Sequence, residues 1–188
     1  MDLKLEDKTA LVTGSTAGIG FAIAKALLSE GARTIINGRS EESVNHAVSK
    51  LESIAKGEVL GFAGDLAQKG AAEELVKAHP HVDVLVNNLG IFEPVPFEQI
   101  TDDDWRRLFE VNVLSGVRLS RLYLPSMKEH NWGRIIFISS ESGIQIPAEM
   151  IHYGMTKAAQ IAVARGMAEH VAGTKITVNS VLPGPTNS

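Results

Sequence analysis

A tyrosine and a lysine four residues apart, Tyr153 and Lys157, carry the clearest chemical pattern in this chain. Residues with this spacing share one face of a helix, so the ammonium can lie beside the phenol. A phenol titrates near pH ~10 in water, and a neighbouring cation favours the phenolate. The sequence therefore predicts that Lys157 lowers the pKa of Tyr153 enough for general acid or base catalysis near neutral pH. A partly buried tyrosine with a satisfied hydroxyl is the alternative.

A serine, Ser140, lies upstream of this pair at the end of an apolar stretch. A short loop with a glycine and a proline, Gly143 and Pro147, separates it from Tyr153. The three polar residues are therefore delivered by the end of one strand, one loop and the start of one helix.

A glycine-rich turn at 13–20 reads Thr-Gly-Ser-Thr-Ala-Gly-Ile-Gly and lies between an apolar strand and a helix. Glycines let the backbone turn sharply and approach a pyrophosphate, whose charge then meets the helix N-terminus. The spacing is Gly-x-x-x-Gly-x-Gly rather than the Gly-x-Gly-x-x-Gly of the dinucleotide fingerprint. A glycine turn without a ligand is the alternative, and the strand–turn–helix context favours phosphate binding.

Apolar strands and amphipathic helices alternate along the whole chain. The expected strands cover 9–13, 33–37, 59–63, 82–86, 134–139 and 176–182, and the expected helices cover 21–30, 40–54, 71–78, 101–129 and 153–172. This alternation predicts an α/β fold, with a parallel sheet covered by helices on both faces. Right-handed crossovers favour a Rossmann-like doubly wound, three-layer α/β/α arrangement with strand order 3-2-1-4-5-6. Residues 1–188 contain no repeat or linker and are expected to form a single domain.

Composition excludes several classes of function. The chain is 44% hydrophobic and 21% charged, with a net charge of −4, so no basic surface for nucleic acid is expected. Without cysteines it has no disulfides and no thiolate metal sites or nucleophiles. His79 and His81 lie in a polar loop without a third ligand, and no metal site is expected. The chain has no leader-like or membrane-spanning apolar run, so we expect a cytoplasmic protein.

Taken together, four motifs resemble those of the short-chain dehydrogenase/reductase family. They are Thr-Gly-x-x-x-Gly-x-Gly at 13–20, Asn-Asn-x-Gly at 87–90, Ser140, and Tyr-x-x-x-Lys at 153–157. The resemblance covers essentially the whole chain. It implies a Rossmann fold that binds NAD or NADP and interconverts alcohols and carbonyls by hydride transfer.

The resemblance also implies catalytic roles. Tyr153 resembles the family's acid/base, and Lys157 the residue that lowers its pKa and binds the nicotinamide ribose. Ser140 would hold the substrate carbonyl oxygen. Asn112, midway along the long helix at 101–129, resembles the asparagine that anchors a proton-relay water. A helix bend or a buried hydrogen bond is the alternative for Asn112.

Cofactor contacts are implied in the same way. The pyrophosphate loop would comprise Gly14, Ser15, Thr16, Ala17, Gly18, Ile19 and Gly20. The adenine ring and its ribose would be contacted by Asp65, Leu66, Asn88 and Gly90, and the nicotinamide by Pro183, Gly184, Thr186, Tyr153 and Lys157. A helix N-cap is the alternative for Asp65. Leu89 replaces the family's usual alanine and either crowds the cofactor or packs locally.

The residues at the end of the second strand should determine whether the chain binds NAD or NADP. An acid there binds the ribose of NAD, whereas an arginine accommodates the 2′-phosphate of NADP. The chain reads Asn37-Gly38-Arg39-Ser40, so NADP is favoured and NAD remains possible. A solvated loop arginine is the alternative for Arg39. The residue before Gly18 is Ala17, and not the basic residue of many NADP-binding relatives.

The function expected from the sequence is an NADP-preferring alcohol dehydrogenase or carbonyl reductase. Its substrate would be a small molecule such as a 3-oxoacyl thioester or a small ketone. The alternative is a non-catalytic dinucleotide-binding regulator or scaffold. The family's substrate lid and seventh strand would lie beyond Ser188 and are missing from this sequence.

Assembly and a few isolated residues complete the predictions. The helices at 101–129 and 153–172 carry a second apolar face and are expected to form a homodimer or homotetramer. The side chains of that face are Trp105, Leu108, Val111, Leu114 and Val117. His152 is expected to edge the substrate pocket or to lie at the surface. Tyr123 is expected to pack in the core, and Asp102, Asp103 and Asp104 to cap a helix rather than bind a cation.

Overall fold

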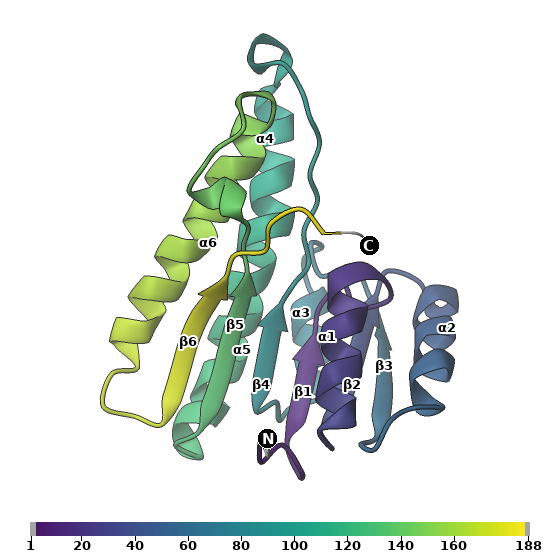
Figure 1. Cartoon of the computed structure of the whole chain (residues 1–188). Helices are drawn as coiled ribbons and strands as arrows, with labels where there is room; N and C mark the ends of the chain where they lie inside the picture. The colour runs from purple at the N-terminus through teal and green to yellow at the C-terminus, as the bar shows by residue number, and fades with distance from the viewer. Residues whose placement is uncertain (1–2, 187–188) are drawn as a thin grey trace.

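The fold is built on one parallel sheet of six strands, shown in Figure 1. A computed structural model describes residues 3–186. The strands are β1 (Thr9–Val12), β2 (Arg33–Gly38), β3 (Val59–Ala63), β4 (Val84–Asn87), β5 (Gly133–Ile138) and β6 (Ile176–Val181). Their order is β3-β2-β1-β4-β5-β6 and every pairing is parallel, which confirms the predicted topology.

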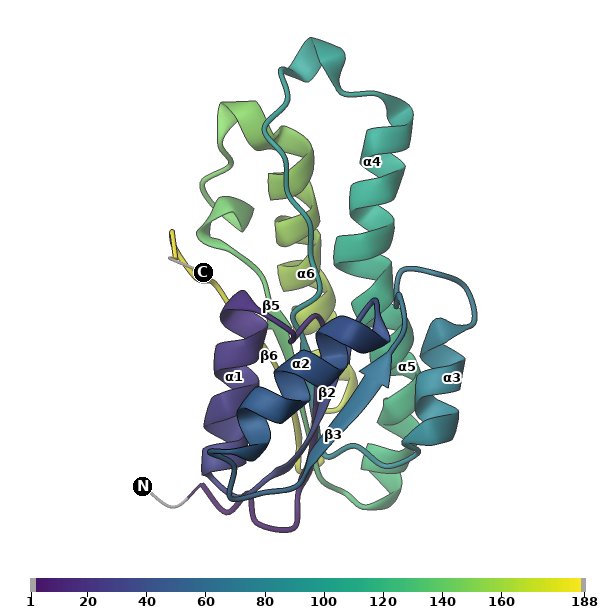
Figure 2. The same cartoon turned by 90° about the vertical axis from the view of Figure 1, so that its right-hand side faces the viewer.

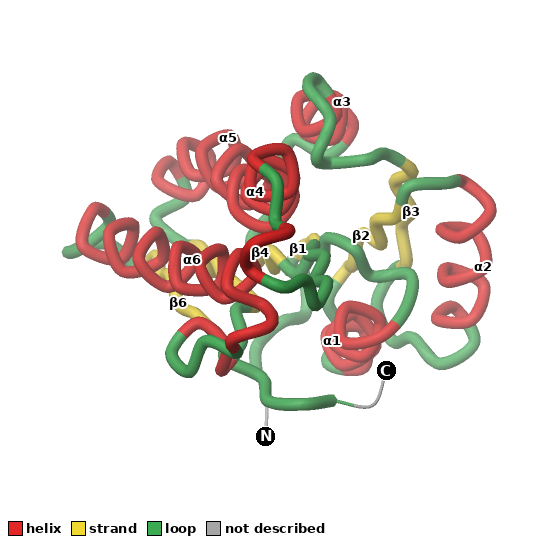
Figure 3. Tube along the Cα trace, turned by 90° about the horizontal axis from the view of Figure 1, so that it is seen from above, coloured by secondary structure: helices red, strands yellow, loops and turns green. Residues whose placement is uncertain are grey.

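Helices cover both faces of the sheet, as the view from above shows (Figure 3). The helices are α1 (Gly18–Ser29), α2 (Glu41–Glu52), α3 (Ala71–Ala78), α4 (Asp102–Phe109), α5 (Ser115–Glu129) and α6 (Ile151–His170). α1 and α2 lie on one side of the strands, and α3, α5 and α6 lie on the other. Within residues 3–186, no helix combines the length and apolar character needed to cross a membrane.

Alternation along the strands explains the two-sided core. Leu11 of β1 and Leu85 of β4 face the cluster formed with α3, α5 and α6. Their neighbours Val12 and Val86 face the cluster formed with α1 and α2. Because side chains of a strand point to opposite faces in turn, a strand buried on both sides must be apolar throughout. This is why the strands read as near-continuous apolar runs.

The predicted helix at 101–129 is one continuous rod with a wider turn in the middle. Thr101 caps α4 in a capping box with Asp104, so the N-terminal prediction is confirmed. Residues Glu110–Leu114 form a π-helical segment in which the Ser115 N–H reaches back to the Glu110 carbonyl. The Ser115 hydroxyl instead donates to the Val111 carbonyl at 2.5 Å. The helix therefore bulges around Asn112.

The carboxyl ends of the strands open onto the segments that carry the predicted site. β1 leads into the glycine turn, β4 into the loop at 88–101, β5 into the loop at 139–150, and β6 into Leu182–Thr186. α4 and the first turns of α6 extend beyond this edge of the sheet (Figures 1 and 2). Ligands of doubly wound sheets bind at this edge.

Candidate active site

The segment after β5 is fastened to α6 and brings Ser140 beside Tyr153. The Ser139 hydroxyl donates to the Lys157 carbonyl at 2.8 Å, which ties the end of β5 to the helix. A Cβ at Gly143 would lie only 3.0 Å from the carbonyl carbon of Lys157, so this loop approaches the helix as closely as glycine allows. The Ser140 hydroxyl accepts a hydrogen bond from the Ser142 N–H at 3.1 Å. Serine and tyrosine are thereby held on adjoining rigid elements.

Tyr153 is half-buried and hydrogen-bonds the Ser140 side chain. Burial raises its pKa above the ordinary value, and the Ser140 hydrogen bond partly opposes this. The prediction that the pKa of Tyr153 lies below its ordinary value is therefore wrong, because burial raises it. The lysine nitrogen lies 5.5 Å from the centre of the tyrosine ring and is directed to another partner. Tyr153 is a protonated phenol at neutral pH, suited to donating a proton.

Lys157 is a buried cation with 4% of its surface exposed. Its ammonium donates to the Ile138 carbonyl at 2.9 Å, and it forms no ion pair within the described residues. Burial lowers its pKa to about 8. A Cβ at Gly90 would lie 3.4 Å from the ammonium, so the loop after β4 passes close to it. An ammonium has three N–H donors, and a buried one that donates to a single carbonyl is suited to an electron-rich ligand such as a ribose hydroxyl.

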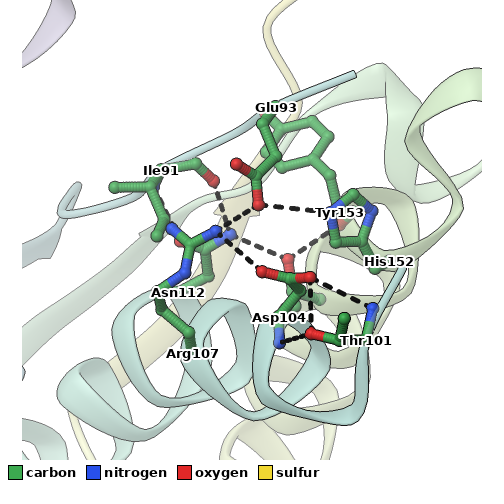
Figure 4. Close-up of polar contacts among 9 residues, drawn as sticks. Ile91, Glu93, Thr101, Asp104, Arg107, Asn112, His152 and Tyr153 are labelled. Carbon is green, nitrogen blue, oxygen red and sulfur yellow. Dashed lines mark hydrogen bonds and ion pairs between the residues drawn. The ribbon is translucent and has the colours of Figure 1, made fainter. Parts of the chain in front are cut away.

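Asn112 forms a buried hydrogen-bond network, drawn in Figure 4. Its side chain accepts from the Ile91 N–H at 2.8 Å and donates to the Ile91 carbonyl at 2.9 Å. It also donates to the Thr156 hydroxyl at 2.9 Å, and its backbone carbonyl accepts from the Gln160 amide at 2.6 Å. The helix bulge and buried bonds expected as the alternative for Asn112 are therefore present. Its role in a proton relay stays a prediction.

The glycine turn leaves the N-terminus of α1 open. Gly14 and Gly18 have φ of +59° and +57°, which glycine adopts without strain. Ala17 precedes α1 in an extended conformation and gives no side-chain cap. The first N–H groups of a helix have no intrahelical partner, so this end can receive an anion. The chain thus fits the pyrophosphate of a dinucleotide at the amides around Ala17, Gly18 and Ile19.

Two members of the predicted pyrophosphate loop have their donors occupied. The Ser15 N–H donates to the Asn37 carbonyl and the Ser15 hydroxyl to the Val12 carbonyl. The Gly14 N–H donates to the Asn37 side chain at 3.1 Å. Ser15 is fully buried and holds β1 to β2. Gly14 and Ser15 therefore shape the turn with these donors, and the predicted contact of both residues with the cofactor stays a prediction.

Arg39 is exposed at the end of β2 and shares one cleft with the glycine turn. The cleft is lined by Gly14, Thr16, Asn37, Gly38, Arg39, Gly64, Asp65, Leu66 and Leu89. Asn37 is not available to a ligand, because its amide donates to the Phe62 and Gly64 carbonyls. Arg39, directly after β2, is therefore the cationic side chain that lines this cleft.

Comparisons with known proteins agree with this geometry. Residues 8–188 match the family model described as short chain dehydrogenase. The chain belongs to the short-chain dehydrogenase family. It is thus an NAD(P)-dependent oxidoreductase that acts on CH–OH groups.

Three members of this family illustrate the similarity. An uncharacterized oxidoreductase of Bacillus subtilis, YvaG, is 52% identical over 99% of this chain and 71% of its own length. L-sorbose reductase from Gluconobacter frateurii, solved with NADPH and L-sorbose, superposes with a TM-score of 0.91 at 31% identity, over 98% of this chain and 72% of its own. NAD⁺-bound xylitol dehydrogenase superposes with a TM-score of 0.89 at 28% identity, over 96% of this chain and 71% of its own. Structures of the family thus contain either dinucleotide.

The remaining predicted cofactor contacts lie around this edge, with mixed outcomes. Asp65 accepts from the Ala67 N–H at 3.1 Å and forms a turn, so it does not cap α3, which begins at Ala71. Leu66 lies in the core and lines the cleft with its neighbours. Leu89 packs against the same core, which confirms the local-packing expectation, and also lines the cleft. Crowding of the cofactor by Leu89 stays a prediction.

Asn88 and the segment at 183–186 join neighbouring loops. The Asn88 amide donates to the Thr13 and Gly14 carbonyls at 2.9 and 3.0 Å, which fixes the loop after β4 to the glycine turn. The Glu141 N–H donates to the Pro183 carbonyl, and the Thr186 hydroxyl to the Gly184 carbonyl. Pro183 and Gly184 therefore lie beside the loop that carries Ser140, and the predicted contacts of Pro183, Gly184 and Thr186 with the nicotinamide stay predictions.

The structure also shows where His152 and Tyr123 lie. His152 is fully buried against Trp105 and lies 3.6 Å from the Glu93 carboxylate, so the surface interpretation is wrong (Figure 4). Tyr123 is buried in the core, as predicted, and donates to the His79 carbonyl. Within residues 3–186, no three His, Cys, Asp or Glu side chains gather as a metal site would need.

Sequence reasoning missed several polar residues that position the site. Thr156 links Asn112 to the Tyr153 carbonyl, Gln160 bonds the Asn112 carbonyl, and Thr13 accepts from the Asn88 and Leu89 amides. Thr156 and Gln160 lie one residue before and three after Lys157. Thr156 is three residues after Tyr153 and four before Gln160, so polar side chains on the helix face of Tyr153 were the available signal.

Proposed function

We propose that the chain is an NADP-preferring alcohol dehydrogenase or carbonyl reductase in which Tyr153 is the proton donor and acceptor. The neighbouring side chains of Ser140 and Tyr153, beside a buried Lys157, are the observation that carries this proposal. These three groups lie at the carboxyl edge of the sheet, where the open N-terminus of α1 also lies. Small ketones and 3-oxoacyl thioesters are the candidate substrates.

In the reduction, bound NADPH supplies the hydride to the carbonyl carbon. The Tyr153 hydroxyl gives its proton to the carbonyl oxygen, and the Ser140 hydroxyl donates a hydrogen bond to the same oxygen as its negative charge grows. One such donor in a preorganised site is worth roughly a hundredfold to a thousandfold in rate. The positive charge of Lys157 favours the tyrosinate left behind. In the oxidation, Tyr153 removes the alcohol proton.

The proposal is tested by following NADPH oxidation with the full-length protein over a panel of ketones, aldehydes and 3-oxoacyl thioesters. We expect turnover with at least one ketone. A folded protein that binds NADPH and reduces none of these carbonyls would refute it.

The preference for NADP is supported by the place of Arg39. It lines the cleft beside the glycine turn, and it forms no ion pair within residues 3–186. A guanidinium recognises phosphate through paired N–H donors. Arg39→Ala is expected to weaken NADPH binding by about tenfold and to leave NADH binding unchanged, because only NADPH carries the 2′-phosphate. Titration of cofactor binding measures both affinities.

Arg33 provides the matched control for Arg39. It lies at the opposite end of β2, where it pairs with Glu58 at 2.6 Å. Arg33→Ala removes the same charge and should leave both cofactor affinities unchanged. Equal losses of NADPH binding in the two variants would show that net charge, not 2′-phosphate recognition, is responsible.

We also propose that the chain forms a homodimer or homotetramer through α4, α5 and α6. Trp105, Val111, Leu114 and Val117 are half-buried within the subunit and present apolar surface along these helices. Leu108, predicted as part of the same face, is fully buried in its own subunit and is therefore not part of that face. Sedimentation velocity at micromolar concentration should give a dimer or tetramer, and a monomer would reject the proposal.

A further inference from the structure

Two loops flank the catalytic tyrosine and run side by side. They are the loop at 88–101 after β4 and the loop at 140–150 after β5, joined by a hydrogen bond from the Val95 N–H to the Glu149 carbonyl at 2.9 Å. From the first loop, the Phe92 ring lies with its centre 6.0 Å from that of Tyr153. From the second, Ile146 packs on Gly154, the residue after Tyr153. A Cβ on Gly154 would lie 2.5 Å from a methyl carbon of Ile146. Each loop thus places an apolar side chain against the start of α6.

These side chains are exposed to an unusual degree. Phe92 is 70% exposed, Ile144 72% and Ile146 47%, and we call the three the apolar rim. Single exposed apolar side chains are ordinary on protein surfaces. The apolar rim instead lies on the two loops that border Tyr153, and apolar surface with a few directed polar groups is typical of small-molecule sites.

The same two loops contain no lysine, arginine or histidine, and they carry four glutamates. The glutamates are Glu93, Glu98, Glu141 and Glu149. The nearest cations are already engaged: Lys157 is buried against the Ile138 carbonyl, and Arg107 pairs with Glu93 and Asp104. A negatively charged substrate would therefore meet carboxylates without a free cation in either loop.

We propose that the preferred substrate is an uncharged ketone, or the matching secondary alcohol, with an aryl or alkyl group that packs on the apolar rim. This inference rests on the proposed function and narrows its substrate class. Oxo acids, phosphorylated sugars and the highly charged coenzyme A thioesters are disfavoured by the acidic loops. Sugars without apolar surface gain nothing from the apolar rim.

Two matched substrate pairs test this proposal with the full-length protein and NADPH. Ethyl 3-oxobutanoate and 3-oxobutanoate share one reacting carbonyl and differ in charge, while acetophenone and acetone differ in apolar surface. We expect kcat/KM to be at least about tenfold higher for the first member of each pair, the scale of discrimination that apolar pockets reach. Equal or reversed values within the two pairs would overturn the proposal.

Three variants assign the discrimination to these loops. Phe92→Ala and Ile146→Ala should each lower the ratio of kcat/KM for acetophenone to kcat/KM for acetone several-fold. Gln145→Arg, an exposed position between Ile144 and Ile146, should raise kcat/KM for 3-oxobutanoate several-fold, because it adds a cation to the acidic loop. Ile54→Ala is the control, since Ile54 has 49% exposure and lies at the end of α2.

Failure of this inference differs from failure of the proposed function. If the protein folds and binds NADPH but reduces no carbonyl, the proposed function fails and the substrate class fails with it. If it reduces ketones but the rim variants leave the acetophenone-to-acetone ratio unchanged, only the substrate class is wrong.

Discussion

Tyr153→Phe is expected to lower kcat for ketone reduction by about a thousandfold or more, with NADPH binding and the fold unchanged. The change removes the proton donor, a contribution of roughly a hundredfold to ten-thousandfold, and one hydrogen bond to the developing oxyanion. The ring is kept, so the contact with Phe92 persists. Steady-state NADPH oxidation and a cofactor titration on the same preparation measure the two quantities.

Tyr123→Phe is the matched control because the chain has only two tyrosines. Tyr123 donates to the His79 carbonyl far from the site, so its loss should reduce stability by about 1 kcal/mol and leave kcat unchanged. A comparable loss of kcat in both variants would indicate a general effect on folding. Full turnover in Tyr153→Phe would contradict the assignment of the proton donor.

Tyr153→Phe also distinguishes a catalytic role of the chain from a role in dinucleotide binding alone. Gly18→Trp places a bulky side chain at a position with φ of +57°, at the start of α1, and should abolish cofactor binding. If cellular function survives Tyr153→Phe and is lost in Gly18→Trp, the chain acts as a dinucleotide-binding regulator. If both variants lose function, hydride transfer is what the cell requires.

The fold was predictable because each strand is buried on both faces. Val84, Leu85 and Val86 point alternately to two cores, and such a run is apolar at every position. Boundaries were less accurate: β4 begins at Val84 rather than 82, and α1 begins at Gly18 rather than 21. Glycine has low helix propensity, so the first turn of α1 carries no local signal of its start. The tertiary position of the glycine turn determines it.

The proximity of the candidate site residues was predictable from their types and spacing, but their electrostatics were not. The four-residue spacing of Tyr153 and Lys157 predicted proximity, and the two side chains are indeed close. The predicted direction of the Tyr153 pKa was wrong because burial, which depends on the packing of distant segments, raises it. The π-helical bulge at Asn112 was invisible for a similar reason. It is stabilised by Thr156 and Gln160, more than forty positions along the chain.

Lys157→Met is expected to stabilise the protein while lowering kcat/KM by at least about a hundredfold. The activity loss follows from removing a positive charge close to Tyr153. The stability gain follows from burial, which lowers the lysine pKa from 10.5 to about 8 and so costs the folded state about 3 kcal/mol near pH 7. Losing the hydrogen bond to the Ile138 carbonyl costs the variant about 1 kcal/mol of stability. The net gain of about 2 kcal/mol corresponds to a rise in Tm of roughly 4–8 °C.

The pH dependence of this stabilisation identifies its cause. Between pH ~8 and ~10.4 the unfolded chain holds a proton on Lys157 that the folded chain has released, so the wild-type protein gains stability as pH rises. The gain in folding stability from Lys157→Met should therefore be full below pH ~8 and lost above pH ~10.4. Thermal unfolding of both proteins across this range, without added cofactor, measures the difference. Lys25→Met, an exposed lysine on α1, should show no such trend, and a constant difference in Tm for Lys157→Met would mean that packing, not the buried charge, sets its stability.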